Sequence, residues 1–348
     1  MKILYLGTTS QASTTYHRAQ ALKRLGHEVI CLDPKAELTT SLNSRIKQAL
    51  HYRTGYIFLQ NHITKWLKRE ISSITKKPDV IWVDSGELFG IKPLSVLKNL
   101  CDKTVLYCVD DITGTRDGNR FRTAKKALHT YSLCTTPRKY VVDEFFKLGV
   151  KNVHTFWRSY DELIHEPFSN REDIPHEFMS DVVFVGTLIP GENRDVFLHQ
   201  LIQQGINVSI WGSGWQRSPF WSVLKAHWQG PPLSGRDYTA AVQGAKICLG
   251  FLSKGNRDLH TRRSAEIPFS GGLFCAQRTE EHLEMFEEGT EAIFWDDVEE
   301  CASQCKKLID NDSLRESIRS SGMKKVRSLK CGNEYVLKDI LDNLKIES

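Results

Sequence analysis

The chain lacks the features that mark membrane-spanning, secreted and dinucleotide-binding proteins. It has no run of about 18 or more apolar residues, so no transmembrane helix is expected, and its first residues already have strand character, so no signal peptide is expected. The turn Gly7–Ser13 after the first strand lacks the Gly-x-Gly-x-x-Gly pattern. This argues against a dinucleotide-dependent oxidoreductase.

Cysteine is scattered rather than patterned. The nine cysteines are an odd number, and several of them lie inside apolar, strand-like runs. This usage predicts reduced thiols in the cytoplasm rather than a disulfide framework. Cys301 and Cys305 are four residues apart on a predicted helix, but no neighbouring Cys or His pair completes a zinc motif. We therefore expect no metal site.

The composition is that of an ordinary globular protein. The 348 residues suit two domains of average size, and 40% apolar with 26% charged residues allows a sizeable core. The net charge of +5 fits anionic ligands or an anionic membrane face. It is too small to indicate nucleic acid, and no nucleic-acid partner is expected.

The order of strands and helices predicts an α/β fold with two Rossmann-like α/β/α domains that face each other across a cleft. Apolar runs that alternate with helical segments begin at Lys2 and begin again at Asp181, after a stretch with two prolines and little periodicity. The predicted divisions are a domain over 1–164, a linker over 165–180, a domain over 181–328 and a C-terminal helix over 329–348 that crosses back to the first domain.

Polar residues gather in the stretch 250–297, between the end of a buried strand and the next helix, where α/β proteins hold ligands. Arg262 and Arg263 precede Glu266 by one helical turn. Two guanidiniums at the leading end of a helix suit a diphosphate, and a carboxylate one turn further on suits a ribose diol. The alternative is a surface helix with one Arg–Glu pair.

This stretch resembles the donor-binding signature of glycosyltransferases of the GT-B fold, family 4. The resemblance is strongest to the subgroup of CgeB-like, spore-maturation proteins, which carry R-x-x-E-x-P-x-x-G-G, a strand and then E-H-x-x-x-F-x-x-G. The matching residues are Arg263, Glu266, Pro268, Gly271, Gly272, Glu281, His282, Phe286 and Gly289. The wider family has Glu-x7-Glu on this helix, whereas here Asp258 replaces the first glutamate.

The resemblance implies where the sugar donor binds. Arg262, Arg263 and the residues His260 and Thr261 would meet the diphosphate, Glu266 the ribose and Asp258 the sugar. Other donor contacts would come from the first turns of the second domain, at Gly186, Thr187, Arg194 and Gly212. The family has Gly-Arg-x4-Lys-Gly in the first of these turns. Thr187 stands at the Arg position, and Arg194 lies near the Lys position.

The first domain would bind the acceptor. Its candidate contacts follow strand ends or lie on the first helix: Thr8, Thr9, Ser10, His17, Arg18, Asp84 and Glu87. For His17 and Arg18 the alternative is an exposed pair on a capped helix. Asp110 and Asp111 are candidates for a catalytic base if the enzyme inverts, or for a loop-capping turn. The GT-B fold generally needs no metal, so neither a metal nor a cofactor is expected.

Residues 35–77 carry nine basic side chains against two acidic ones, with apolar residues spaced for amphipathic helices. Basic amphipathic helices with Trp and Tyr lie on anionic membranes. The alternative is a solvated face of an ordinary helix pair.

Taken together, the sequence predicts a cytoplasmic glycosyltransferase, a retaining hexosyltransferase that moves a sugar from a nucleotide-diphosphate sugar to a glycan, lipid-linked glycan or protein, as in cell-envelope polysaccharide synthesis. Contact with the cytoplasmic membrane face would come through residues 35–77. The alternative is a catalytically inactive GT-B-like protein that binds sugars or partners in envelope or spore-coat assembly.

Overall fold

A computed structural model describes residues 1–346. These residues form two compact units. The first comprises Met1–Trp157, Gly255–Arg257 and the segment that begins at Asn333, and the second comprises Arg158–Lys254 and Asp258–Gly332. Within residues 1–346, no helix is long and apolar enough to cross a membrane.

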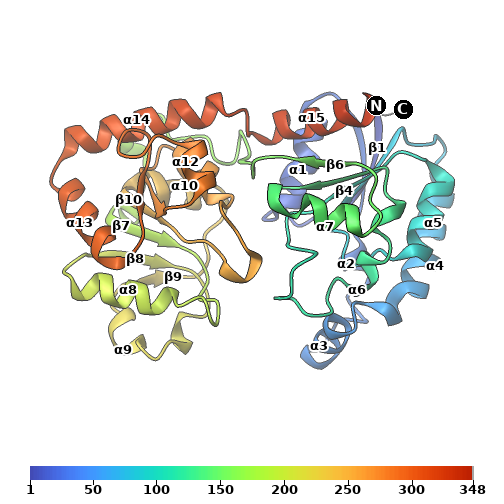
Figure 1. Ribbon diagram of the computed structural model, residues 1–348, viewed down its shortest axis with the longest axis horizontal. Helices are drawn as coiled ribbons and strands as arrows, with labels where there is room; N and C mark the ends of the chain where they lie inside the picture. The colour runs from blue at the N-terminus through green and yellow to red at the C-terminus, as the bar shows by residue number, and fades with distance from the viewer. Residues whose placement is uncertain (347–348) are drawn as a thin grey trace. The chain divides into compact units, whose positions relative to one another are not determined.

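The first unit is built on a six-stranded parallel sheet in the order β2-β1-β3-β4-β5-β6 (Figure 1). β1 and β3 are buried along their whole length, as expected of near-continuous apolar strands in a sheet covered on both faces. The strands are β1 (Lys2–Leu6), β2 (Glu28–Leu32), β3 (Val80–Asp84), β4 (Thr104–Tyr107), β5 (Leu133–Thr136) and β6 (Val153–Thr155).

Alternate residues of these strands feed two separate cores. Leu4 and Leu6 pack in the larger core with residues of α4 and α5. Ile3 and Tyr5 point to the other face, into a core shared with α1 and α15, and Figure 1 draws these two helices beside the first sheet. The α-helices of this unit are α1 (Thr14–Arg24), α2 (Pro34–Glu37), α3 (Arg45–Arg53), α4 (Gln60–Ser72), α5 (Ile91–Leu100), α6 (Arg122–Lys125), α7 (Val142–Lys147) and α15 (Asn333–Ile346).

The second unit repeats the design with a six-stranded parallel sheet in the order β12-β11-β10-β7-β8-β9. Its strands are β7 (Ser180–Val185), β8 (Val208–Trp211), β9 (Trp228–Gly230), β10 (Ala245–Gly250), β11 (Phe274–Gln277) and β12 (Ile293–Trp295). Its α-helices are α8 (Arg194–Gln203), α9 (Trp221–Leu224), α10 (Gly235–Gly244), α11 (Arg263–Phe269), α12 (Glu280–Met285), α13 (Val298–Ile309) and α14 (Asp312–Ser328).

The C-terminal helix was predicted over 329–348. The structure begins α15 at Asn333, after Leu329–Gly332, and the last two residues of the predicted range lie outside the described residues. α15 packs into the core that it shares with α1, through Val336, Leu337 and Ile340.

Candidate functional site

The first two strands of the second sheet end in glycines that must approach each other closely. Gly212, after β8, has a φ of +146°, and a Cβ atom there would lie 2.0 Å from the carbonyl oxygen of Gly186, after β7. The indole N–H of Trp215 donates to that same oxygen at 3.0 Å, and that of Trp228 donates to the oxygen of Gly212 at 2.9 Å. The backbones of these glycines are therefore held close together at the carboxyl edge of the sheet.

Arg194, the first residue of α8, joins two loops at this edge. Its guanidinium donates to the carbonyl oxygen of Thr187 at 3.1 Å and to that of Leu252 at 3.2 Å. The side chain is buried. The sequence assigns Arg194 to a donor phosphate; here it holds the loops that follow β7 and β10, while the hydroxyl of Thr187 hydrogen-bonds to Ser213.

Arg262, Arg263 and Glu266 meet as their spacing predicts. α11 begins at Arg263, and Arg263 Nη1 lies 2.6 Å from one oxygen of Glu266, while Arg262 Nε lies 3.7 Å from the other. Arg263 also donates to the carbonyl oxygen of Val185, the last residue of β7, and stacks on the ring of Tyr238. The Glu266 side chain is 2% exposed, whereas that of Arg262 is 49% exposed. One arginine is thus fixed and the other is open to solvent.

The environment of Glu266 keeps it charged. Burial raises the pKa of the carboxyl, but Arg262 and Arg263, together with His165, outweigh burial and hold that pKa at about 2. His165 Nε2 lies 3.6 Å from Glu266. This histidine comes from the segment before β7, about a hundred residues away in sequence, so no local pattern in the sequence marks it.

Three buried histidines surround α11, and each has one ring nitrogen that accepts a hydrogen bond. His165 accepts from the N–H of Asp161 and His260 from that of Arg158. His282 bonds to the Ser264 hydroxyl through Nε2 and to the Gln277 carbonyl through Nδ1, which must therefore carry the proton. Burial lowers the pKa of all three rings, in the case of His282 to about 4. All three are therefore neutral in the folded protein at pH 7.

We expect the protein to lose stability on mild acidification because of these histidines. Their pKa values are lower in the folded than in the unfolded chain, so the unfolded chain binds more protons as the pH falls below about 6.5. For His282, whose folded pKa is about 4, the loss between pH 7.5 and 4.5 is on the order of 2–3 kcal/mol. Urea unfolding at both pH values measures it.

His282→Gln should reduce the difference in the free energy of unfolding between pH 7.5 and 4.5 by that amount. His176→Gln, at an exposed position, should leave this difference unchanged. Glu266 does not interfere, because its low pKa affects stability only below about pH 4.5. Equal pH dependence in wild type and His282→Gln would show that His282 is not the group responsible.

The remaining predicted donor residues are engaged in local contacts. The side chain of Asp258 is 5% exposed and lies 3.3 Å from Arg158. His260 also contacts Glu281 at 2.5 Å. The Thr261 hydroxyl accepts the N–H of Arg263 at 3.1 Å, and the N–H of Thr261 donates to the Ser264 hydroxyl at 3.1 Å, so Thr261 orders the turn before α11.

The corresponding edge of the first sheet holds a buried ion pair. Asp84, at the end of β3, accepts from Arg18 Nε at 2.8 Å and Nη2 at 3.0 Å, and from the hydroxyl of Tyr5 at 2.6 Å. Both Arg18 and Asp84 are buried. The exposed pair that the sequence allows for Arg18 is therefore wrong, because Arg18 turns inward to Asp84. His17 is on the outer side and contacts the Gln11 carbonyl.

Three of the predicted acceptor residues share one small cavity. Thr8, Asp84 and Glu87 line a space of about 40 Å³, together with Lys35. Burial raises the pKa of Glu87, but Lys35, at 3.0 Å, and Arg120 reverse this and hold the pKa below its usual range. Glu87 therefore stays ionised, and its charge is paired with those of Lys35 and Arg120.

The other predicted residues near this cavity hydrogen-bond to the protein itself. Thr8 and Thr9 both donate to Asp33, while Ser10 is exposed and its carbonyl accepts from the Ser13 hydroxyl. Asp110 pairs with Arg120 at 3.3 Å.

Asp111 is buried and accepts two hydrogen bonds from Arg257, at 2.6 and 2.8 Å. It also accepts the N–H of Gly114, which fits the loop-capping alternative. Since Asp111 is fully occupied here, Asp110 is the better placed of the two candidate bases.

One cluster of possible metal ligands occurs among residues 1–346. The sulfur atoms of Cys275, Cys301 and Cys305 lie within 4.8 Å of one another. β11 supplies the third thiol, which the local spacing of Cys301 and Cys305 does not reveal. All three are buried in the apolar core of the second unit, where thiols also pack as small apolar side chains.

Comparisons with known proteins concern the family and the fold. A family model described as glycosyl transferase-like matches residues 194–342, which include Arg194 and the whole of α11. A comparison with curated protein sequences finds no match.

Solved structures match the chain over its length. Anabaena HepE in complex with UDP and glucose is 13% identical, with a TM-score of 0.66 and 99% of both chains covered. Sucrose-phosphate synthase from Thermosynechococcus elongatus is 10% identical, with a TM-score of 0.71 and 100% of both chains covered. The N-terminal domain of Candida albicans trehalose-6-phosphate phosphatase is 12% identical, with a TM-score of 0.65, 100% of this chain and 97% of that chain covered. The predicted α/β GT-B fold is confirmed; the CgeB-like subgroup stays a prediction.

Proposed function

We propose that the protein is a glycosyltransferase that takes its sugar from a nucleotide-diphosphate sugar bound at the carboxyl edge of the second sheet. The observation that carries this is the group Arg262, Arg263 and Glu266 beside the end of β7. The complexes of Anabaena HepE with UDP and with UDP-glucose support the class of donor.

In this proposal the fixed and the mobile arginine have different tasks. Loss of the nucleoside diphosphate builds up negative charge on its outer phosphate, and positive groups held in place stabilise that charge. Arg263 is fixed by Glu266 and Val185, so it contributes without reorganisation. Arg262, half exposed, closes onto the phosphates when the donor binds. Glu266 accepts from the ribose hydroxyls through the oxygen that faces Arg262.

We further propose that transfer needs no metal ion and retains the configuration of the sugar. The cations at the donor site would stabilise the charge that a metal ion would otherwise stabilise. Retention is supported by the fact that Asp111, a candidate base for an inverting reaction, is already bound bidentately by Arg257. Acceptor hydroxyls would contact the group around Asp84 and Glu87 in the first unit. The proposed acceptor is a glycan or lipid-linked glycan of the cell envelope, and the transfer would take place in the cytoplasm.

Titration calorimetry with UDP and GDP tests the proposal, followed by incubation with the sugar conjugates of whichever nucleotide binds. We expect one nucleotide to bind with a Kd in the micromolar range and its conjugate to release the nucleotide slowly, with no loss of rate in EDTA. No binding of either nucleotide would favour the inactive sugar- or partner-binding protein. Binding without turnover on any acceptor would point to the same alternative.

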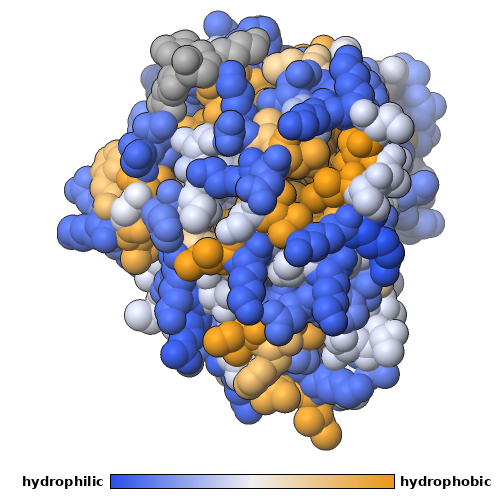
Figure 2. All heavy atoms as spheres, turned by 90° about the vertical axis from the view of Figure 1, so that its right-hand side faces the viewer, coloured by the Kyte–Doolittle hydropathy of each residue, from blue (hydrophilic) through white to orange (hydrophobic). Residues whose placement is uncertain are grey.

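We also propose that α3 and the turn after it contact an anionic membrane. None of the residues of α3 is buried, and Ile46 on α3 and Phe58 in the following turn are 83% and 67% exposed. Arg45, Lys47 and Arg53 lie on the same helix. Figure 2 views the right-hand side of Figure 1. It shows hydrophobic side chains among hydrophilic ones at its lower end, at the height of α3 in Figure 1. Exposed apolar groups flanked by bases suit an interfacial helix.

Co-sedimentation with vesicles checks this. The protein should pellet with phosphatidylcholine vesicles that contain phosphatidylglycerol and not with phosphatidylcholine alone. Ile46→Glu combined with Phe58→Glu should lower the bound fraction about tenfold, because two apolar contacts are lost and two repulsive charges are gained. Ile91→Glu, an exposed isoleucine at the start of α5, is the matched control. Binding that does not depend on anionic lipid would leave α3 as a solvated helix.

A further inference from the structure

The second unit has a pocket, lined by arginines, at the edge of its sheet opposite to the proposed donor site. The cavity has a volume of about 510 Å³, within the range of small-molecule sites. Its lining includes Arg171, Arg319 and Arg327 and the single carboxylate of Glu316. Positive charge therefore prevails in it. The remaining lining residues are Pro167, Phe168, Gln243, Gly271, Ser320 and Met323.

The position of this pocket separates it from the donor site. Gln243 is near the end of α10, directly before β10, and Gly271 is in the turn before β11, so the pocket lies at the amino ends of these strands. The proposed donor groups lie at the carboxyl ends. β10 has six residues, and at about 3.3 Å per residue the two edges are roughly 15–20 Å apart. One ligand cannot occupy both.

Arg319 on α14 is the best-fixed base in the pocket. Its guanidinium donates to the Ala245 carbonyl at 2.9 Å and pairs with Glu316 at 3.0 Å, and its side chain is only 11% exposed. Its buried Nε has no hydrogen-bond partner in the described part of the chain. Burial lowers the pKa of Arg319, and the nearby charge of Arg171 lowers it further. Glu316 offsets one of these two cationic charges, and the buried Nε donor of Arg319 stays unused, so the site can take a further anion.

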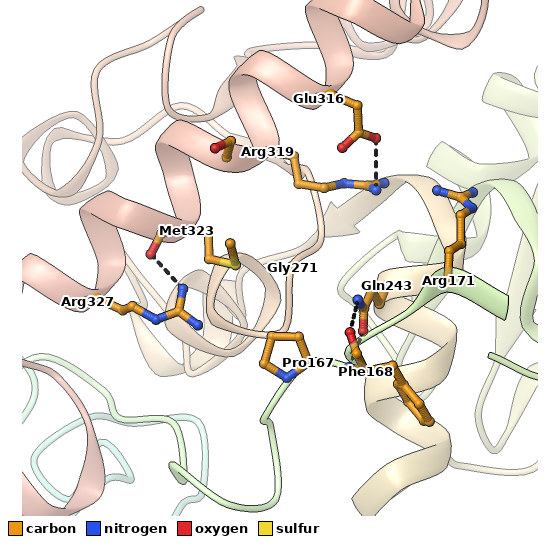
Figure 3. A pocket seen from close by; sticks show the side chains of 10 residues that line it. Pro167, Phe168, Arg171, Gln243, Gly271, Glu316, Arg319, Met323 and Arg327 are labelled. Atoms are coloured by element: carbon orange, nitrogen blue, oxygen red, sulfur yellow. Dashed lines mark hydrogen bonds and ion pairs between the residues drawn. The ribbon is translucent and has the colours of Figure 1, made fainter. Parts of the chain in front are cut away.

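The other two arginines have donors to spare. Arg171 has a single long contact of 3.5 Å to the Gly244 carbonyl, and Arg327 donates to the Met323 carbonyl at 3.1 Å. A guanidinium has five N–H donors, so several remain on each. Figure 3 shows Arg171 and Arg319 extending toward each other from different segments, with Pro167 and Phe168 along the lower side of the pocket and Met323 on α14 between Arg319 and Arg327.

We propose that this pocket binds a phosphate monoester, with the phosphate between Arg171 and Arg319 and an apolar or ring-shaped remainder against Phe168 and Met323. Bidentate guanidinium contacts suit the oxygens of a phosphate. The bland reading is that Arg171 and Arg319 merely cap the last carbonyls of α10. That reading accounts for one or two donors on each of these arginines. It leaves unused the cavity and the remaining donors of Arg327, whose guanidinium contacts the Met323 carbonyl and the ring of Phe269.

Calorimetry on the full chain with phenyl phosphate, in the presence of saturating UDP, tests the proposal. One phenyl phosphate should bind with a Kd of about 1 mM or lower, and more tightly than inorganic phosphate. Arg171→Gln and Arg327→Gln, both at exposed positions, should each weaken binding about tenfold. Lys324→Gln on the same helix is the matched control, and Arg262→Gln, in the proposed donor site, should have no effect.

Three results would overturn the proposal: no binding in the millimolar range, binding by the Arg171→Gln and Arg327→Gln variants that is as tight as that of wild type, or loss of binding when UDP is added. The last would move the phosphate into the donor site. Phenyl phosphate binding to a chain that binds no nucleotide would leave this pocket standing and reject the proposed function instead.

Discussion

Asp84→Asn is expected to lower the free energy of unfolding by about 3–5 kcal/mol, the effect of breaking a buried ion pair by removing one partner. The side chain of Asp84 is 2% exposed and that of its partner Arg18 is 7% exposed, and the hydroxyl of Tyr5 donates to the Asp84 carboxylate. Asparagine keeps the shape but leaves the guanidinium charge of Arg18 without its anion in the core. Urea unfolding at pH 7.5 gives the difference.

Two variants separate the lost charge from other causes. Glu28→Gln removes a carboxylate that also pairs with a base, Lys2, but is 61% exposed, and it should cost less than about 1 kcal/mol. Adding Arg18→Met to Asp84→Asn should recover part of the loss, because no unpaired cation then remains buried. If Asp84→Asn cost no more than Glu28→Gln, the network of Arg18, Tyr5 and Asp84 would not be a source of stability.

Much of the fold could be predicted from the sequence because each buried strand is marked by a local run of apolar residues. β1, β3, β7 and β10 are continuous apolar runs, and the chain begins the same pattern twice. The sequence of β5 reads LCTT and that of β9 reads WQG, which are too short and too polar to stand out. These strands exist because β4 and β8 offer them an open edge.

Helix ends were harder to predict. Gly322 lies within the helical stretch that follows Asp312, and glycine commonly ends helices. α14 continues to Ser328. Gly322 serves packing instead, because a Cβ there would lie 2.3 Å from the carbonyl oxygen of Glu291. A single sequence does not distinguish a glycine required by a neighbouring segment from one that ends a helix.

The candidate site divides in the same way. The contact of Arg262 and Arg263 with Glu266 follows from helical spacing and could be predicted. His165, Tyr238 and Val185 reach the same group from other segments and could not. Likewise Asp84 lies at a strand end as predicted, but its partner Arg18 is 66 residues away. Local periodicity identifies the groups, and only the tertiary fold shows which charges already neutralise one another.

Arg263→Ala is expected to weaken binding of the nucleoside diphosphate by about 1.5–3 kcal/mol, or about 10- to 150-fold, because a charge-assisted contact with the phosphates is lost. The nucleoside alone should bind with unchanged affinity, since Arg263 is proposed to contact only phosphate. Glu266→Gln should weaken both ligands, because the ribose is common to them. Calorimetry with each ligand on each variant gives four values that separate the two roles.

Arg315→Ala provides the matched control. Arg315 is also buried in the second unit, pairs with a carboxylate three residues away, Asp312, and donates to backbone carbonyls, but it lies on α14. Both alanine variants should be less stable than wild type, and only Arg263→Ala should lose nucleotide affinity. If the two variants bound the diphosphate equally well, Arg263 would be a structural partner of Glu266 and the phosphate contact would pass to Arg262. Since Arg262 is the more exposed arginine and is held less tightly, Arg262→Ala would then carry the whole expected loss.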